Sequence, residues 1–245
     1  MDNYKNVLKN ILKKLGYDIK KTPPIGSDPF KDMAFFLNGI GEPIIFDIGA
    51  NIGQSVDRIK KAIPRSIIHS FEPSPDSFWE LTEHCKKYNN VNTWNCGIGS
   101  SEKVLPFFEN HSPTFSSFLE LGETTGTYIE KVTNVDIITL DSFARANNID
   151  FIDVVKSDTQ GFEFEVFKGA EKLMNDNKIG LLYFEFTFSD MYIGLPKFNE
   201  VFQFLTEHNF LFVCYYEQRF LNNLISWTDV MFINSEYYKN RKSIG

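Results

Sequence analysis

Short apolar runs alternate with amphipathic segments along much of the chain. Residues 43–47 form an apolar run that ends in an acid, and residues 54–62 then follow a helical pattern. The same succession returns over residues 66–71 and 75–88. Strands that alternate with helices at this spacing predict a parallel sheet built from right-handed β-α-β units. Further strands are expected over residues 91–98, 153–156, 180–186, 210–216 and 230–233, and further helices over 162–174 and 197–208.

The middle of the chain interrupts this alternation. Residues 104–108 and 132–140 alternate between apolar and polar positions, as strands do. Residues 111–127 are rich in Ser, Thr and Gly and predict a loop. A loop of this length inside a compact domain is usually functional or mobile.

The N-terminal residues predict a helical extension. Residues 4–15 place apolar side chains at helical spacing and four lysines on the other face. Residues 22–27 form a connector, and residues 28–37 a second short helix. We therefore expect a helical extension over residues 1–40 and one domain over residues 41–245. The first helix is expected to pack on the flank of that domain; weak membrane contact and a homodimer formed through it are the alternatives.

Composition narrows the class of protein. A chain of 245 residues, 42% of them hydrophobic, can bury one full core, and a net charge of −7 argues against a nucleic-acid surface. No apolar run reaches the roughly 18 residues of a membrane span, and no secretory signal is visible. The three widely spaced cysteines form neither a disulfide framework nor a zinc pattern, which is typical of reduced thiols in a cytoplasmic protein.

A glycine-rich turn is the most informative motif. Residues 47–53, Asp-Ile-Gly-Ala-Asn-Ile-Gly, lie between a strand and a helix, where glycines allow close approach of a ligand and the helix offers free N–H groups. Glu72 stands 72 − 53 = 19 residues after Gly53 at the end of the next strand. A carboxylate there can accept both ribose hydroxyls of an adenosine ligand. Together these features predict a nucleoside-binding α/β fold.

The details of the turn favour one nucleoside ligand. Dinucleotide sites prefer Gly at the middle position for approach to a pyrophosphate, whereas this chain has Asn51 there and Asp47 ahead of the glycines. An acid in the turn suits S-adenosylmethionine, which has a sulfonium, an ammonium and no phosphate. That cofactor is therefore expected. An NAD(P)-dependent oxidoreductase and a catalytically silent module that assembles through the first helix are the alternatives.

Four segments of the chain resemble the FkbM-type S-adenosylmethionine-dependent methyltransferases. They are residues 46–53, Phe71-Glu72-Pro73, residues 136–143, and residues 156–163 with Gly169-Ala170; the similarity covers roughly residues 28–233. The resemblance implies a Rossmann-like class I methyltransferase domain that methylates a hydroxyl of a sugar, nucleotide-sugar, surface glycan or related secondary metabolite. We expect a mostly parallel, seven-stranded sheet with an antiparallel final strand. Family members often have Glu where this chain has Gln160, which removes one candidate base or metal ligand.

Carboxylates at strand ends are the candidates for catalysis. Methyl transfer to oxygen requires the acceptor about 3 Å from the methyl carbon and removal of the acceptor's proton. Asp158 follows one core strand and is the first candidate for the base, or for a residue that positions substrate and cofactor; Glu185 at the end of the next strand is the second. His111, in the Ser/Thr-rich loop, is the third. Glu163 is expected to complement a helix dipole. No metal is expected, because no His/Cys spacing supports zinc and positioning alone can suffice for methyl transfer. A divalent cation held by the carboxylate oxygens of Asp158 and Glu185 is the alternative.

The remaining site predictions follow from topology. Residues 95–97 would lie beside the adenine at the end of the third strand, with a plain turn as the equal alternative. Ser116 and Ser117 lie in the loop that the resemblance places near the substrate. Tyr216 and Trp227 could contact a sugar, whereas the other C-terminal aromatics are expected in the core. The predicted cofactor residues are Asp47, Gly49, Asn51, Gly53, Glu72, Pro73, Asn95, Cys96, Gly97 and Asp158, and the predicted substrate residues are Ser116, Ser117, Gln160, Tyr216 and Trp227.

Overall fold

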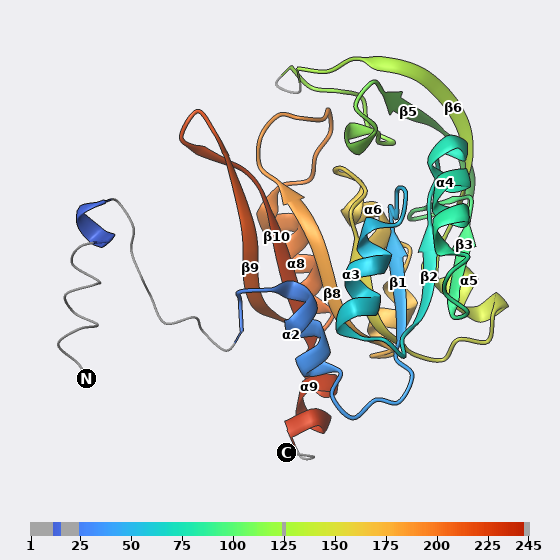
Figure 1. Ribbon diagram of the computed structural model, residues 1–245, viewed down its shortest axis with the longest axis vertical. Helices are drawn as coiled ribbons and strands as arrows, with labels where there is room; N and C mark the ends of the chain where they lie inside the picture. The colour runs from blue at the N-terminus through green and yellow to red at the C-terminus, as the bar shows by residue number, and fades with distance from the viewer. Residues whose placement is uncertain (1–11, 16–24, 124–125, 243–245) are drawn as a thin grey trace.

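A seven-stranded sheet forms the centre of the protein (Figure 1). The computed structural model describes residues 12–15, 25–123 and 126–242. The strand order is β3-β2-β1-β7-β8-β10-β9, and β10 alone is antiparallel to its neighbours. This confirms the predicted fold class, including its antiparallel final strand. The strands are β1 (Ile44–Ile48), β2 (Ile67–Phe71), β3 (Val91–Trp94), β7 (Ile152–Ser157), β8 (Ile179–Thr187), β9 (Phe210–Leu221) and β10 (Leu224–Asn234).

Helices cover both faces of this sheet, and each face buries its own apolar cluster. On one face lie α2 (Pro29–Phe36), α3 (Gln54–Ala62) and α4 (Pro75–Cys85), with α9 (Ser235–Lys242) at one end. On the other face lie α5 (Leu140–Ala146), α6 (Glu163–Lys168), α7 (Glu171–Asn175) and α8 (Phe198–Glu207). The order of the strands reverses between β1 and β7, and in open α/β sheets such a point opens a crevice at the carboxyl ends of the strands.

Helix starts near this edge are specified locally. Asp28 caps α2 by accepting from the N–H groups of Phe30 and Lys31, and Ser74 caps α4. Both helices have proline at their first position, where its missing N–H costs nothing.

A smaller sheet adjoins the main one. It consists of β4 (Gly97–Ile98), β6 (Ile129–Ile138) and β5 (Lys103–Asn110), in that order. The strand predicted over 91–98 is therefore two strands: β3 pairs with β2, and β4 pairs with β6. A Cβ at Gly97 would lie 2.5 Å from both Ile137 and Phe118, so only glycine permits this second pairing. Figure 1 shows β5 and β6 above the carboxyl ends of β1 and β2.

Other expectations were wrong in detail. The helix predicted over 162–174 is divided into α6 and α7 at Gly169, where a Cβ would lie 2.1 Å from the carbonyl oxygen of Gly99. The loop over 111–127 contains, in its described part, one short 3-10 helix, η1 (Pro113–Phe115). The strands β9 and β10 are longer than predicted and form a hairpin whose turn, Asn222-Asn223, has φ values of 51° and 66°, as a two-residue type I′ turn requires.

The predicted N-terminal helix lies outside the described residues except for 12–15, of which 12–14 are helical. The membrane and dimer roles suggested for it stay predictions, as does the domain boundary at residue 41. The second helix of the extension, α2, buries Phe30, Met33 and Leu37 against the sheet. None of the helices in the described part of the chain has the length and apolarity needed to cross a bilayer.

Candidate active site

The glycine-rich turn after β1 is wedged between two neighbouring loops. The N–H groups of Gly49 and Ala50 both donate to the carbonyl of Phe71 at 3.0 Å, and Asp158 N donates to the carbonyl of Ile48 at 2.9 Å. Gly49 has φ +72°, and a Cβ there would lie 1.9 Å from the carbonyl oxygen of Asp158. Only glycine fits this position, so the turn places the backbone of residues 49–51 between Glu72 and Asp158.

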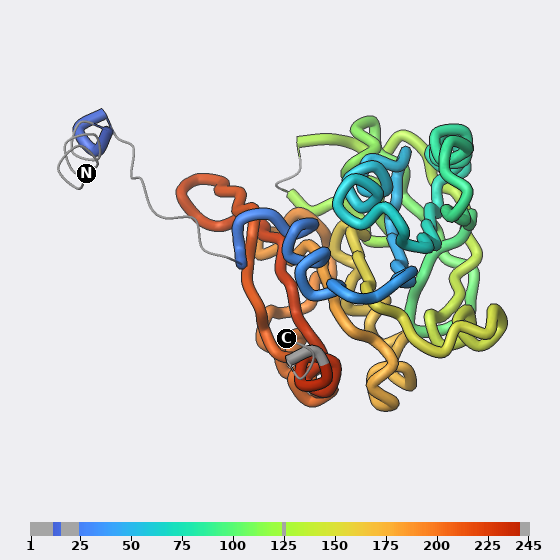
Figure 2. The backbone as a smooth tube through the Cα atoms, turned by 60° about the horizontal axis from the view of Figure 1, so that its bottom comes forward, coloured from blue at the N-terminus to red at the C-terminus, as the bar shows by residue number. Residues whose placement is uncertain are grey.

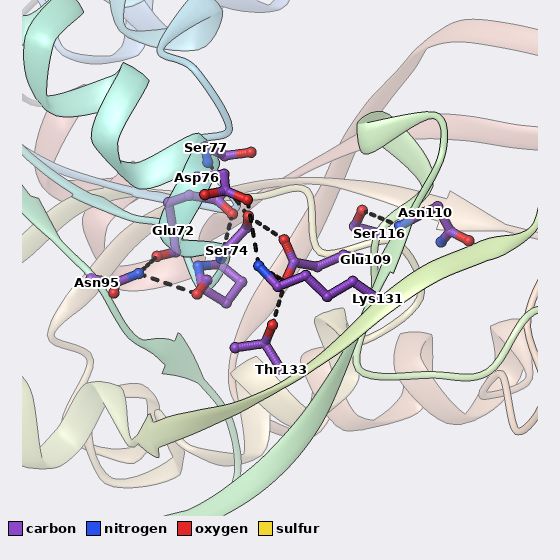
Figure 3. A network of polar contacts seen from close by, with 11 residues as sticks. Glu72, Ser74, Asp76, Ser77, Asn95, Glu109, Asn110, Ser116, Lys131 and Thr133 are labelled. Atoms are coloured by element: carbon purple, nitrogen blue, oxygen red, sulfur yellow. Dashed lines mark hydrogen bonds and ion pairs between the residues drawn. The ribbon is translucent and has the colours of Figure 1, made fainter.

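Glu72 is held by backbone donors on both of its oxygens. Its Oε2 accepts from Asn51 N at 2.8 Å, and its Oε1 accepts from Ser74 N at 2.9 Å. The side chain of Asn95 donates to the carbonyls of Glu72 and Pro73, which fixes the loop itself (Figure 3). Glu72 is only 5% exposed, and burial raises its pKa from an ordinary 4.5 to about 7.

Glu72 lines a cavity of about 120 Å³, the Glu72 cavity. Aromatic and aliphatic side chains from both sheets line it together with polar groups. Apolar side chains beside the carboxylate of Glu72 suit a nucleoside, whose base is flat and whose ribose offers two hydroxyl donors. The predicted residues on its wall are Gly49, Asn51, Glu72, Pro73, Cys96, Gly97, Ser116, Asp158 and Gln160.

The small sheet is clamped to the loop that bears Glu72 (Figure 3). Glu109 of β5 accepts from Ser74 Oγ at 2.7 Å and from the hydroxyl of Thr133. Lys131 Nζ lies 3.4 Å from both Glu109 and Asp76, the second residue of α4. Glu109 therefore fixes the hairpin that carries the η1 segment over the cavity. The sequence did not single out Glu109, because its importance arises from pairing between distant segments.

A second cavity, the Glu185 cavity, has a volume of about 300 Å³. It shares Gly49, Asn51, Thr114 and Asp158 with the Glu72 cavity, so the two adjoin and Asp158 lies at their junction. Carboxylates dominate its charges. Its lining includes Phe30, Arg58, Lys156, Tyr183, Glu185, Glu217, Trp227 and Asp229.

Lys156 is the buried cation of this region. Its Nζ lies 3.0 Å from Asp47 and 3.7 Å from Asp158. Burial alone would lower the pKa of Lys156, but the carboxylates of Asp47 and Asp158 outweigh it and raise that pKa. Asp47 is fully buried, also accepts from Ser55, and lines neither cavity. Any effect of Asp47 on the cofactor would therefore pass through Lys156 or Ser55, which both line the Glu185 cavity.

Gln160 joins the two candidate bases. Its Nε2 donates to Asp158 Oδ1 at 2.9 Å and to Glu185 Oε1 at 3.4 Å, while its Oε1 accepts from the Tyr192 hydroxyl at 2.8 Å. Burial raises the pKa of Tyr192, so the phenol keeps the proton that it donates. Gln160 has φ +55°, and Ser117 Oγ donates to its carbonyl at 2.8 Å. A residue held at both ends in a sparsely populated conformation is typical of a functional site.

Glu185 and Asp229 lie directly opposite each other on the antiparallel strands β8 and β10. Burial, and then the neighbouring carboxylates Asp158 and Glu163, raise the pKa of Glu185 well above its ordinary value. Burial likewise raises the pKa of Asp229 to about 6, although Tyr183 donates to it at 2.6 Å. The sequence did not reveal Asp229, because only the pairing of β8 with β10 brings it to Glu185.

Several predicted residues lie away from both cavities. His111 is 62% exposed, stacks on Tyr128 and lies 3.7 Å from Glu130. Tyr216 lies further out and donates to Asp32 at 2.9 Å. Glu163 accepts from Thr159 N at 2.7 Å, and burial raises its pKa to about 7. Within residues 12–15, 25–123 and 126–242, no group of three or more His, Cys, Asp or Glu side chains is arranged to hold a metal. The predicted residues that line neither cavity are Asp47, Gly53, Asn95, His111, Ser117 and Tyr216.

Known proteins similar to this chain are methyltransferases. The 2-O-methyltransferase NoeI of Sinorhizobium fredii is 22% identical over 184 residues, which cover 66% of this chain and 75% of that protein. The hexuronic acid methyltransferase AglP of Haloferax volcanii is 28% identical over 129 residues, which cover 52% of this chain and 50% of AglP. The structure of M. capricolum TrmK in complex with S-adenosyl-homocysteine aligns with a TM-score of 0.48 at 12% identity, over 85% of this chain and 69% of that one.

The chain also matches a protein family over most of its length. Residues 47–212 match the Methyltransferase FkbM domain. The matched span includes the glycine-rich turn, Glu72, Asp158, Gln160 and Glu185. The chain therefore belongs to the FkbM methyltransferase family and is an S-adenosylmethionine-dependent methyltransferase.

Proposed function

We propose that the protein methylates a hydroxyl group of a sugar, a nucleotide-sugar, a surface glycan or a related secondary metabolite. The observation that carries this proposal is the position of Asp158 at the junction of a nucleoside-shaped cavity and a second, polar cavity. One relative is described as a 2-O-methyltransferase, which supports methylation of an oxygen, and another as a hexuronic acid methyltransferase, which supports a sugar acceptor.

The residues of the Glu72 cavity fit the cofactor. Glu72 would accept the ribose hydroxyls once ionised, and Ile48, Phe71 and Ile98 would enclose the adenine. When bound, S-adenosylmethionine would supply a methyl group that an acceptor oxygen can take from the sulfonium, with S-adenosylhomocysteine as the leaving group. The carboxylates of the Glu185 cavity suit this positive charge.

Asp158 is the base in this proposal. It lines both cavities, its side chain is 45% exposed, and Gln160 fixes one of its oxygens. It can therefore reach an acceptor hydroxyl next to the cofactor and take its proton. Glu185 lines only the second cavity, and its raised pKa favours the protonated form. We assign Glu185 to hold the acceptor by a hydrogen bond.

The test begins with calorimetry of the purified protein with S-adenosylhomocysteine and, separately, with NAD(H). Micromolar binding of S-adenosylhomocysteine alone is expected, followed by a gain of one methyl group on a sugar acceptor in mass spectrometry. Asp158→Asn should lower kcat by about 100-fold or more while S-adenosylhomocysteine affinity changes little. An unchanged kcat would remove Asp158 from catalysis. Cofactor binding without methylation of any acceptor would favour the silent module, and binding of NAD(H) the oxidoreductase.

A further inference from the structure

A groove leads outward from the Glu185 cavity, between the start of α2 and strand β9. It has a volume of about 410 Å³, and we call it the α2 groove. Residues 26–29 and Tyr216 line its outer part. Four residues that line the groove also line the Glu185 cavity, so the two hollows adjoin; these are Arg58, Tyr183, Glu217 and Asp229. Figures 1 and 2 both show α2 beside the β9–β10 hairpin.

Specific contacts fix the walls of the α2 groove. The Tyr216 hydroxyl donates to Asp32 Oδ2 at 2.9 Å, and Gly26 N donates to the same oxygen at 2.7 Å. The Tyr216 ring packs edge-on against Tyr183, with centroids 5.9 Å apart. The guanidinium carbon of Arg58 lies 4.1 Å from the centroid of Phe30. The groove is therefore a built surface that joins α2 to three strands of the sheet.

The chemistry of this surface matches a sugar. A sugar ring offers hydroxyls on its rim and C–H groups on its faces, and the groove offers carboxylates, a guanidinium and aromatic rings. The Glu185 cavity must hold the reacting sugar and the reactive end of the cofactor within about 300 Å³. Pockets of 300–1,000 Å³ hold ligands larger than one ring. The additional 410 Å³ therefore leaves room for the next sugar of a chain.

The charges of the two hollows select against anionic acceptors. The Glu185 cavity has four carboxyl groups, those of Asp158, Glu185, Glu217 and Asp229, against two cations, Arg58 and Lys156. With Glu185 protonated, three carboxylates still outnumber the two cations. Lys156 is already paired with Asp47 at 3.0 Å. A uronate or a phosphate would add a negative charge to a site in which the carboxyl groups already disfavour ionisation. A neutral sugar would not add such a charge.

We propose that the α2 groove is a second sugar subsite and that the acceptor is a neutral oligosaccharide of at least two units. The unit that receives the methyl group occupies the Glu185 cavity, and the neighbouring unit lies in the groove against Tyr216. This inference rests on the proposed function, since it assigns the substrate class of the same site.

The test compares acceptors of matched chemistry and different length. Glucose, mannose and N-acetylglucosamine are assayed beside cellobiose, maltose, mannobiose and chitobiose, and beside glucuronic acid. Methyl gain is followed by mass spectrometry with S-adenosylmethionine at saturation. For the sugar that is methylated, the disaccharide should have at least a tenfold higher kcat/KM than the monosaccharide. Glucuronic acid should be the poorer acceptor compared with glucose.

Two variants and a control test whether the groove causes the higher kcat/KM for the disaccharide. Ser27 is exposed on the groove wall, so Ser27→Trp should fill the groove without disturbing the core and reduce the ratio of disaccharide to monosaccharide kcat/KM toward one. Tyr216→Phe, which removes a hydroxyl at the same wall, should reduce the ratio less. Gln218→Ala lies on the same strand outside both hollows and should keep the wild-type ratio.

The outcomes distinguish a failure of the second sugar subsite from a failure of the proposed sugar acceptor. A ratio near one in the wild type, or a ratio that Ser27→Trp leaves unchanged, overturns the subsite and leaves sugar methylation standing. A preference for glucuronic acid overturns the neutral acceptor. If S-adenosylhomocysteine binds and no saccharide of either length is methylated, the proposed sugar acceptor itself fails, and the subsite fails with it.

Discussion

Replacing Glu72 with glutamine should make the protein's stability less dependent on pH. In the unfolded chain this carboxyl loses its proton near its ordinary pKa of 4.5, and in the folded protein near 7. Between these values the folded state holds more protons than the unfolded state, so stability falls as pH rises through this window and levels off above it. Because glutamine has no titratable proton, the stability of the variant should not decrease in this way between pH 4.5 and pH 7.

The magnitude follows from the pKa and the burial of Glu72. At about 1.4 kcal/mol per pKa unit, ionising a group with a pKa of about 7 in place of 4.5 costs the folded state about 3 kcal/mol. Glu72 is 5% exposed, so solvent screens little of this. The amide has one acceptor oxygen, and either Asn51 N or Ser74 N therefore loses its partner, at a cost of about 1–3 kcal/mol. That loss applies at every pH and cancels when two pH values are compared.

Urea unfolding at pH 5 and pH 8 measures the effect. The free energy of unfolding of Glu72→Gln minus that of wild type should be about 2–3 kcal/mol higher at pH 8 than at pH 5. Glu83→Gln, which removes an exposed carboxylate that pairs with Lys86, serves as the control for loss of charge. The same difference between Glu72→Gln and wild type at both pH values would refute the reasoning. Calorimetry at pH 8 should show that Glu72→Gln binds S-adenosylhomocysteine at least tenfold more weakly than wild type does. Glu72→Ala should not bind it, and wild-type affinity in Glu72→Ala would refute the contact between Glu72 and the ribose.

Four further substitutions test other parts of the site. Tyr192→Phe removes the donor that fixes the Gln160 amide, so kcat should fall about tenfold while the KM for S-adenosylmethionine stays within about twofold. Gln160→Glu should move the acidic limb of the pH profile of kcat/KM to higher pH. An unchanged profile would show that residue 160 does not influence the base. Glu109→Gln weakens the hydrogen bonds that join the small sheet to Ser74. The affinity for S-adenosylhomocysteine, measured by calorimetry, should therefore fall about three- to tenfold. Wild-type affinity would show that these hydrogen bonds do not shape the cavity. Gly49→Ala places a Cβ 1.9 Å from the Asp158 carbonyl at φ +72° and should destabilise the protein by about 2–4 kcal/mol in urea unfolding; a loss below about 1 kcal/mol would contradict the close approach.

The core of the fold could be predicted because its signals are local. Helix α3 has the predicted bounds, residues 54–62, since its apolar spacing and the glycine that precedes it belong to one continuous segment. The divisions at Gly97 and Gly169 could not be predicted in the same way. In each case the cause is a close approach by a distant segment, Ile137 and Phe118 at the first and the backbone of Gly99 at the second.

The site residues likewise divide into those with a local signal in the sequence and those placed by contacts between distant segments. Glu72 directly follows β2 and Asp158 directly follows β7, and a chain that alternates strands and helices places residues after parallel strands at one edge of the sheet. Thr114 and His111 lie three residues apart in one loop, yet Thr114 lines both cavities while His111 is mostly exposed. A loop without periodicity does not indicate which of its side chains points inward. Asp229 reaches Glu185 only through the pairing of β8 with β10.

The buried carboxylates connect the stability of the protein to its chemistry. Glu72, Glu163, Glu185 and Asp229 all have raised pKa values, and all lie near the carboxyl ends of the central strands. A core selected for stability alone would not concentrate groups that disfavour their own ionisation. A site for a cationic cofactor gains from them, because a positive charge that enters restores the ionised forms. The stability that the unliganded protein loses as the pH rises toward 7 is thus tied to Glu72 and Asp229, which line the two cavities and make the crevice attractive to a sulfonium.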